Sequence, residues 1–201
     1  MPKVLVLFYS RTGNTAALAD AIAEGAESVK FTEVELRRIE HLAPASVIDA
    51  DDAWKAARAV LAKKYRTLES AESLALYDAV IIGSPRRDGM MSEELRQALD
   101  GAAPLGGRRA LVDKVGSAFA PVGSSEGEEG HEAHLFSMLV PMMHFGMIIV
   151  PPDLGAVRGL TGNGVPGAAE LAAAREQGAR VAKVAEWVRH AKSHEAHGHK
   201  H

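Results

Sequence analysis

The chain has 201 residues, of which 47% are hydrophobic and 24% charged, and its formal net charge is −3 with a pI near 6.3. This length and composition predict one globular domain with a full core, and the mild acidity disfavours nucleic acid or an anionic membrane as a partner. Cysteine is absent, which excludes disulfides, thiolate metal sites and cysteine nucleophiles. No apolar run reaches the ~20 residues of a membrane span, and a strand begins at once after the N-terminus. We therefore expect no membrane span, no secretory signal peptide and a cytoplasmic location.

Five segments have the hydrophobic pattern of β-strands. In chain order, the predicted strands are Val4–Phe8, Phe31–Arg38, Tyr77–Gly83, Val115–Ala120 and Met147–Val150. The first and the third are continuous apolar runs, as in buried parallel strands, whereas the second alternates as a strand near an edge does.

Apolar residues recur at helical spacing between and after these strands. The predicted helices are Thr15–Glu27, Asp51–Lys64, a helix capped by Ser92 that ends near Leu99, His131–Phe145 with a kink at Pro141, and Ala168–Lys192. Strands that alternate with helices predict an α/β fold, in which helices cover both faces of a parallel sheet in a three-layer, doubly wound arrangement. In such a sheet the ligand binds at the carboxyl ends of the strands.

We expect residues 1–192 to form a single domain, because no linker or internal repeat divides them. Residues 193–201 are a polar, His-rich tail for which we expect disorder. The alternative for this tail is a metal bound by His194, His197, His199 and His201. No metal site is predicted in the domain itself.

The segment Tyr9–Thr15 joins the first strand to the first helix and reads Tyr-Ser-Arg-Thr-Gly-Asn-Thr. Backbone N–H groups at a helix N-terminus and the hydroxyls of Ser10, Thr12 and Thr15 can bind a phosphate, and Gly13 allows a tight turn. The segment lacks both the Gly-Lys-Ser/Thr ending of a Walker loop and the three glycines of the dinucleotide fingerprint. It instead resembles the flavodoxin motif Ser/Thr-x-Thr-Gly-x-Thr, which implies a flavodoxin-like five-stranded fold and a site for the monophosphate of FMN. The alternative is an ordinary strand-to-helix turn rich in hydroxyls.

Two further segments narrow the resemblance. Gly83–Ser92 reads Gly-Ser-Pro-Arg-Arg-Asp-Gly-Met-Met-Ser, and His144–Pro151 reads His-Phe-Gly-Met-Ile-Ile-Val-Pro. Both resemble segments of the WrbA family of flavodoxin-fold, FMN-dependent NAD(P)H:quinone oxidoreductases. The chain departs from that family at two aromatic positions, which are Asp88 and Gly106 here. These departures bear on substrate preference and leave phosphate binding untouched.

Carried over position by position, the resemblance assigns several segments to the flavin site. The FMN-binding positions that it implies are Ser10, Arg11, Thr12, Gly13, Asn14, Thr15, Pro85, Arg86, Arg87, Asp88, Gly89, Pro121, Val122, Gly123, Ser124, Ser125, Glu126 and His144. A guanidinium of Arg86 or Arg87 would stabilise negative charge on the reduced flavin, and His144 would be the catalytic proton source for a reduced quinone. The alternatives are solvated arginines and a histidine that the dipole at a helix C-terminus stabilises.

His144 also raises a conflict of topology. It precedes the last predicted strand, and a helix that enters a parallel strand arrives at the edge opposite the ligand. The resemblance and the topology agree only if His144 reaches the flavin of another subunit. The Met-rich surface around it would then be buried by oligomerisation.

The resemblance implies an enzyme in which FMN takes hydride from NAD(P)H and passes two electrons to a quinone by a ping-pong mechanism. It also implies a homo-oligomer, either a dimer or a tetramer. The alternatives are a flavodoxin-type electron carrier and an FMN-binding regulatory protein with weak reductase activity. Because the chain has few aromatic residues and carries Arg86 and Arg87 in the predicted flavin loop, the enzyme is the favoured hypothesis.

Overall fold

The computed structural model describes residues 1–121, 131–152 and 165–198, with side chains through His194. At its centre is a five-stranded sheet in the order β2-β1-β3-β4-β5, in which every neighbouring pair is parallel. The strands are β1 (Lys3–Phe8), β2 (Glu33–Arg38), β3 (Ala79–Gly83), β4 (Val115–Phe119) and β5 (Ile148–Ile149). This order confirms the predicted doubly wound arrangement.

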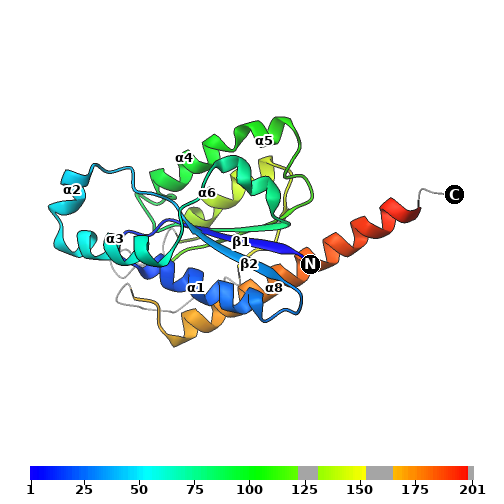
Figure 1. Ribbon diagram of the computed structural model, residues 1–201, viewed down its shortest axis with the longest axis horizontal. Helices are drawn as coiled ribbons and strands as arrows, with labels where there is room; N and C mark the ends of the chain where they lie inside the picture. Colours follow the sequence, from blue (N-terminus) through cyan, green and yellow to red (C-terminus); the bar gives the residue numbers. More distant parts are fainter. Residues whose placement is uncertain (122–130, 153–164, 199–201) are drawn as a thin grey trace.

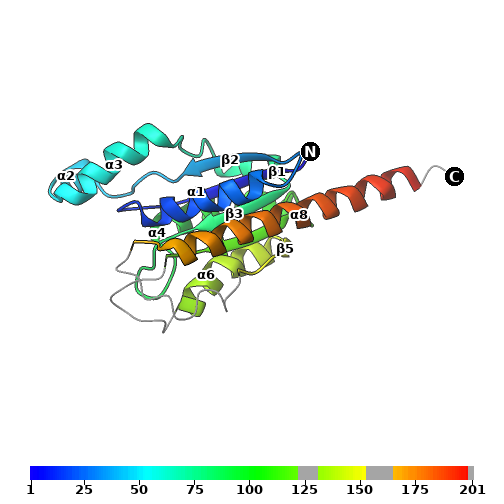
Figure 2. The same cartoon turned by 90° about the horizontal axis from the view of Figure 1, so that it is seen from below.

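Helices cover both faces of the sheet (Figures 1 and 2). One face packs against α1 (Asn14–Glu27) and α8 (Ala168–Gly198), and the other packs against α4 (Glu93–Gly101), α5 (Ala103–Gly107) and α6 (His131–His144). Three short or peripheral helices complete the described chain: α2 (Ala45–Asp49), α3 (Asp52–Lys64) and the 3₁₀-helix η1 (Ala71–Leu76). Helices α2 and α3 lie beyond the carboxyl ends of the strands, at the left of Figure 1.

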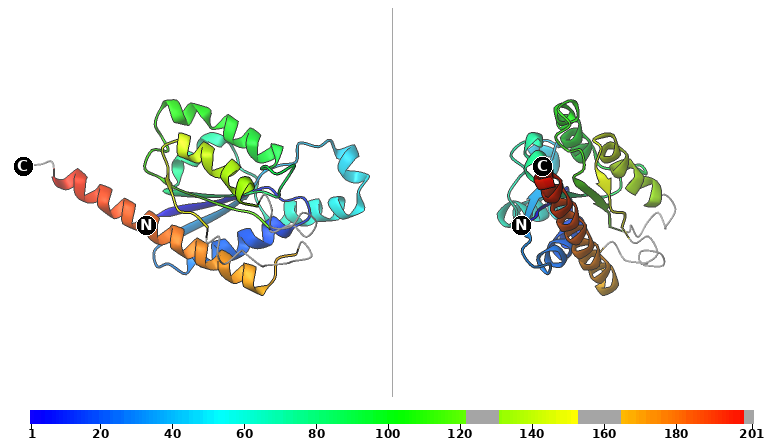
Figure 3. Two further views of the ribbon diagram at one scale, coloured as in Figure 1. Left: turned by 180° about the vertical axis from the view of Figure 1, so that it is seen from behind. Right: turned by 90° about the vertical axis from the view of Figure 1, so that its right-hand side faces the viewer.

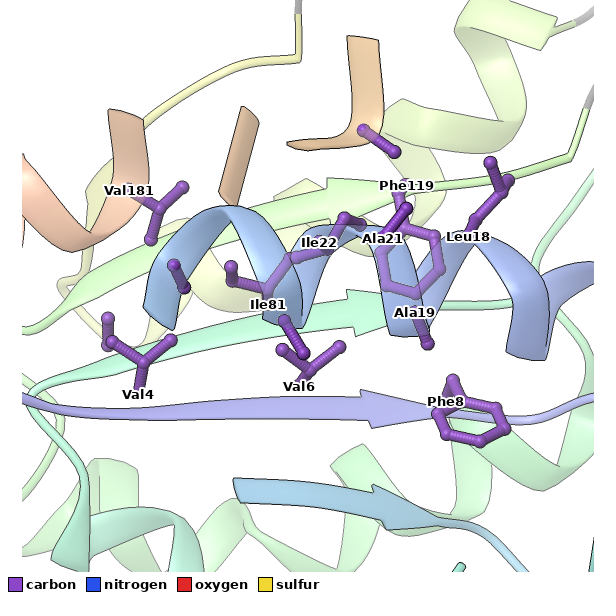
Figure 4. Close-up of a cluster of buried hydrophobic side chains, with 14 of the residues drawn as sticks. Val4, Val6, Phe8, Leu18, Ala19, Ala21, Ile22, Ile81, Phe119 and Val181 are labelled. Atoms are coloured by element: carbon purple, nitrogen blue, oxygen red, sulfur yellow. The ribbon is translucent and has the colours of Figure 1, made fainter. Parts of the chain in front are cut away.

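The continuous apolar run in β1 is explained by burial on both faces. Val4, Val6 and Phe8 pack towards α1 and α8, as Figure 4 shows, whereas Leu5 and Leu7 pack towards α4, α5 and α6. All five side chains are fully buried. A strand with two buried faces has no polar alternation, as predicted.

Several elements differ from the sequence-based expectation. The last strand is confined to Ile148–Ile149, which pairs with only the start of β4. The short helices α2, α5 and η1 were not predicted, because each is too brief to show a clear period.

The predicted tail is partly helical. Helix α8 continues through Gly198 instead of ending at Lys192, and Figure 3 shows it projecting past the sheet. No glycine or proline interrupts the chain between Gly178 and Gly198, so the helix can continue along good helix formers. The structure thus extends α8 into residues 193–198 of the tail for which we expect disorder, and residues 199–201 lie outside the described chain.

Candidate functional site

Two loops leave the carboxyl edge of the sheet side by side, and a third begins beside them. The backbone N–H of Tyr9 donates to the carbonyl of Gly83 at 3.0 Å, and that of Ser84 donates to the carbonyl of Phe119 at 3.4 Å. The loops that follow β1, β3 and β4 therefore start at neighbouring positions. Pro121 begins the third loop, and its predicted site residues lie outside the described chain: Val122, Gly123, Ser124, Ser125 and Glu126.

The N-terminus of α1 is open to an anion. Its N-cap is Gly13, in the left-handed region at φ 103°, and within the described chain no side chain caps it and no acidic residue lies in its first turn. By contrast, α3 is capped by Asp51 and α4 by Ser92, and both have acidic residues in their first turns. The first backbone N–H groups of a helix have no intrahelical partner, and the helix dipole makes this end positive. The backbone N–H groups in the first turn of α1 are therefore available to a ligand, whereas capping side chains accept from the corresponding groups of α3 and α4.

The hydroxyl residues around this end have different exposures. Ser10 and Thr15 are buried at 4% and 1% exposure, whereas Thr12 is exposed. The Oγ of Ser10 accepts a hydrogen bond from the backbone N–H of Gly13 at 3.0 Å, which closes the turn. Apart from its chain neighbours and its own helix, no atom of the described residues lies within 4 Å of the position that a Cβ would take on Gly13. Within the described chain, the backbone there is accessible. An open turn lined by hydroxyls and free N–H groups fits a phosphate.

The side chain of Arg11 is held by helix α3. Its Nη2 atom donates to Oδ2 of Asp51 at 3.0 Å, and its Cζ atom lies 4.1 Å from the centre of the Trp54 ring. The hydrogen bond that Asp51 accepts from the backbone of Trp54, and then Arg11 itself, keep the pKa of Asp51 below its usual value. The resemblance implies a direct role for Arg11 at the cofactor, and this contact with α3 was not predicted. In the structure, this ion pair joins the loop after β1 to the start of α3.

The loop after β3 contains a tight turn that was not predicted. Asp88 and Gly89 have φ values of 49° and 78°, and Arg87 and Met90 exchange two backbone hydrogen bonds of 2.9 Å. Positive φ at both central residues is typical of a type I′ turn, for which Asp-Gly is a preferred pair. Asp88 therefore stands at an exposed turn tip, where a short polar residue is tolerated better than a bulky one.

Buried hydroxyls fix the two ends of this loop. The Oγ of Ser84 donates to the carbonyl of Pro85 and accepts from the backbone N–H of Ser92, both at 2.8 Å. The backbone N–H of Met91 donates to Oγ of Ser137 on α6 at 2.9 Å. Arg86 and Arg87 are thus carried on a loop that is fixed on both sides.

A buried histidine lies within reach of the charge of Arg86. His134 of α6 is fully buried, and neither of its ring nitrogens has a hydrogen-bond partner within the described chain. Burial, together with the charges of His131 and Arg86, lowers the pKa of His134 to about 4. The imidazole is therefore neutral near pH 7. Its only mark in the sequence is a position on a largely apolar predicted helix.

His144 lies at the opposite edge of the sheet. It ends α6, and the following Gly146 accepts a hydrogen bond from the backbone N–H of Asp113, just before β4 begins. Its side chain is exposed, and the fold of one chain does not bring it to the loops after β1 and β3. The ring of the adjacent Phe145 lies 3.4 Å from the Cβ position of Gly106. An aromatic side chain therefore covers the site where the resemblance places a tryptophan.

A membrane-spanning helix and a cluster of metal ligands are both absent from the part of the chain that the structure describes. None of its helices is long and apolar enough to cross a bilayer. It also contains no group of three or more potential metal-ligating side chains.

Known proteins resemble this chain in sequence and in fold. Residues 2–159 match the family described as NADPH-dependent FMN reductase. A protein named NAD(P)H dehydrogenase (quinone) from Cupriavidus metallidurans is 37% identical over 204 residues, which cover 92% of this chain and 98% of the relative. A protein of the same name from Archaeoglobus fulgidus is 39% identical over 195 residues, with the same coverage of both chains. Among solved structures, this chain is similar to the flavodoxin, WrbA-like protein from Agrobacterium tumefaciens, with a TM-score of 0.61 and 24% sequence identity. The match covers 93% of this chain and 99% of that chain, and it confirms the flavodoxin-like fold.

Proposed function

This chain belongs to the family of NADPH-dependent FMN reductases, and from that premise we propose that it binds FMN and passes two electrons from NAD(P)H to a quinone. The relatives named NAD(P)H dehydrogenase (quinone), at 37% and 39% identity over nearly their whole length, support the pair of substrates. The open N-terminus of α1, with Gly13 at its cap and no acidic residue in its first turn, is the observation that carries the cofactor assignment.

The phosphate of FMN would bind to the loop after β1. Its donors would be the hydroxyls of Ser10, Thr12 and Thr15 and the backbone N–H groups of the segment, including those of Arg11 and Asn14. A terminal phosphate suits this tight turn at a helix N-terminus better than a phosphate that continues into an adenylate.

The flavin ring would lie between the loops after β3 and β4. Pro85, Arg86, Arg87, Asp88 and Gly89 line the first of these loops, and its two guanidinium groups bring positive charge to this edge of the sheet. FMN, when bound, supplies the two-electron chemistry. The protein binds it, orients it and provides the electrostatic environment. A single site that both substrates use in turn gives ping-pong kinetics.

We also propose a homo-oligomer, on the evidence of an apolar face formed by α6 and β5. Phe136, Val140, Met143 and Ile148 are 54%, 40%, 47% and 40% exposed, although each is a large hydrophobic residue. A hollow of about 260 Å³ lies on the same face and is lined by Leu135, Phe136, Leu139 and Met143, among others. Contiguous exposed apolar side chains mark interaction surfaces in soluble proteins. His144 adjoins this face, so a partner subunit covering it would bring the histidine close to a second chain.

The cofactor assignment is tested by titrating the apoprotein with FMN, FAD and riboflavin and following flavin fluorescence. We expect FMN to bind most tightly, and equal or tighter binding of FAD would overturn the assignment. Steady-state oxidation of NADH and NADPH with benzoquinone tests the reaction. Parallel double-reciprocal lines are expected, whereas intersecting lines would reject the ping-pong mechanism.

A further inference from the structure

We propose that Asp51 and Trp54 of the α3 region are positioning residues for the phosphate loop, which they hold through the side chain of Arg11. The inference rests on the proposed FMN site and adds to it two residues outside the set of predicted FMN-binding residues. It assigns a function to α3, an element that follows the edge strand and supplies none of the predicted FMN-binding residues.

Asp51 connects two elements through its two carboxylate oxygens. Oδ1 accepts from the backbone N–H of Trp54 at 2.9 Å and caps α3, while Oδ2 accepts from Nη2 of Arg11 at 3.0 Å. The guanidinium of Arg11 also stacks on the Trp54 ring, at 4.1 Å from its centre. The indole is only 6% exposed, so this stacking surface is fixed by its own packing. Arg11 is therefore bound at two points to the first turn of one helix.

A second connection reaches the residue on the other side of Ser10. The Nε1–H of Trp54 donates to Nδ1 of His41 at 3.4 Å. This Nδ1 atom of His41 also lies 3.1 Å from the hydroxyl oxygen of Tyr9. The Tyr9 and His41 rings meet edge to face with centroids 5.4 Å apart. Tyr9 and Arg11, which flank Ser10, are both linked to Trp54. Because Oγ of Ser10 accepts from Gly13, this linkage continues to the N-cap of α1.

The sign of the expected effect separates this role from a direct one. If Arg11 bound the phosphate itself, its pairing with Asp51 would compete with FMN, and removal of the Asp51 charge would strengthen binding. Simple electrostatics acts in the same direction, because removal of a negative charge close to an anion site favours binding of the anion. If Asp51 positions the loop, removing its charge weakens FMN binding instead.

Asp51→Asn is the decisive variant, because asparagine is as good an N-cap as aspartate and α3 should remain folded. We expect FMN to bind about three- to tenfold more weakly, as suits the loss of one partly exposed ion pair and a loosened cation–π contact. Riboflavin, which lacks the phosphate, should bind within about twofold of wild type. Arg11→Met should have a similar effect, and the double variant should be no weaker than the more affected single variant, since both changes break one contact.

Glu24→Gln is the matched control. It breaks the exposed ion pair between Glu24 and Arg175, which spans 2.7 Å near the opposite end of α1, and it should leave FMN affinity unchanged. Trp54→Phe is a second variant that keeps an aromatic ring but loses the indole N–H, and it too should weaken FMN more than riboflavin. Unchanged or tighter FMN binding by Asp51→Asn overturns the inference. If the wild-type protein itself binds FMN no better than riboflavin, the proposed phosphate site is wrong. Rejection of the positioning role and rejection of the phosphate site therefore give different results.

Discussion

A Cβ atom on Gly178 would stand 1.9 Å from the carbonyl oxygen of Ile22, so α8 and α1 touch backbone to backbone. The contact is reciprocal, because a Cβ on Gly25 would stand 1.9 Å from the carbonyl oxygen of Arg175. Neither distance is possible for a real side chain. The two glycines therefore set how closely these helices approach, and α1 is the helix whose N-terminus forms the candidate phosphate site.

Gly178→Ala is expected to destabilise the protein. In an unobstructed helix interior, alanine is more favourable than glycine by about 1 kcal/mol. Here the added methyl group would push α8 off α1, and overpacking of this kind costs about 1–3 kcal/mol. Urea unfolding measures the difference. Gly107→Ala is the control, because nothing in the described part of the chain lies within 4 Å of that Cβ position beyond its neighbours and its own helix. The free energy of unfolding of this variant should not fall. A Gly178→Ala protein as stable as wild type would contradict the close helix contact.

Thr12→Ala should weaken FMN binding selectively. The side chain of Thr12 is exposed beside the open end of α1, so its loss should not disturb the core. A hydrogen bond to a charged phosphate contributes about 1.5–3 kcal/mol, which corresponds to a roughly tenfold to hundredfold loss of affinity. Fluorescence titration with FMN and riboflavin makes the comparison. Equal weakening of both ligands would mean that this loop does not bind the phosphate.

The sequence predicts the sheet well because its strongest signals are local. The run Val4–Phe8 is apolar at every position, and the hydroxyl-rich loop that follows it begins where the strand ends. A strand buried on both faces and a glycine at a helix N-terminus can both be recognised from a few consecutive residues. The order of the strands followed from the alternation of strands and helices, together with the resemblance carried by the loop.

The contacts that were missed depend on residues far apart in the chain. Arg11 and Asp51 are separated by 40 positions, and no local pattern indicates that α3 packs beside the phosphate loop. The turn at Asp88-Gly89 is different, since that dipeptide is itself a turn signal. The resemblance aligns Asp88 with an aromatic residue, and such an alignment carries no information about the backbone conformation of the turn.

Acid should destabilise the protein through His134. Its pKa falls from 6.5 in the unfolded chain to about 4 in the folded protein, so protonation favours unfolding. The stability contributed by the neutral imidazole is complete above about pH 6.5 and is lost as the pH falls towards 4. Between about pH 7.5 and pH 5, linkage gives a loss of about 2 kcal/mol from this residue alone.

His134→Leu isolates that contribution. Leucine cannot titrate and suits a site without hydrogen-bond partners, so the variant should lose less stability between the two pH values. Burial lowers the pKa of His41 and His131 as well, and both remain in the variant as a common background. Urea unfolding at both pH values provides the measurement. Identical pH dependence in wild type and variant would show that His134 does not titrate in this way.

His144→Ala should separate turnover from cofactor binding. His144 lies at the amino edge of the sheet with Phe145 and Gly106, whereas the phosphate loop lies at the carboxyl edge. If His144 acts on the flavin of a neighbouring subunit, its loss should lower quinone reductase turnover roughly 10²-fold, as for loss of a proton donor. FMN affinity should hardly change, because phosphate binding belongs to the other edge. His190→Ala, which changes another exposed histidine, is the control and should retain full turnover.

Light scattering completes the experiment on His144 by measuring the oligomeric state. A monomeric wild-type protein with full activity would refute a role across subunits. A variant that is monomeric, inactive and still able to bind FMN would instead give His144 a role in assembly.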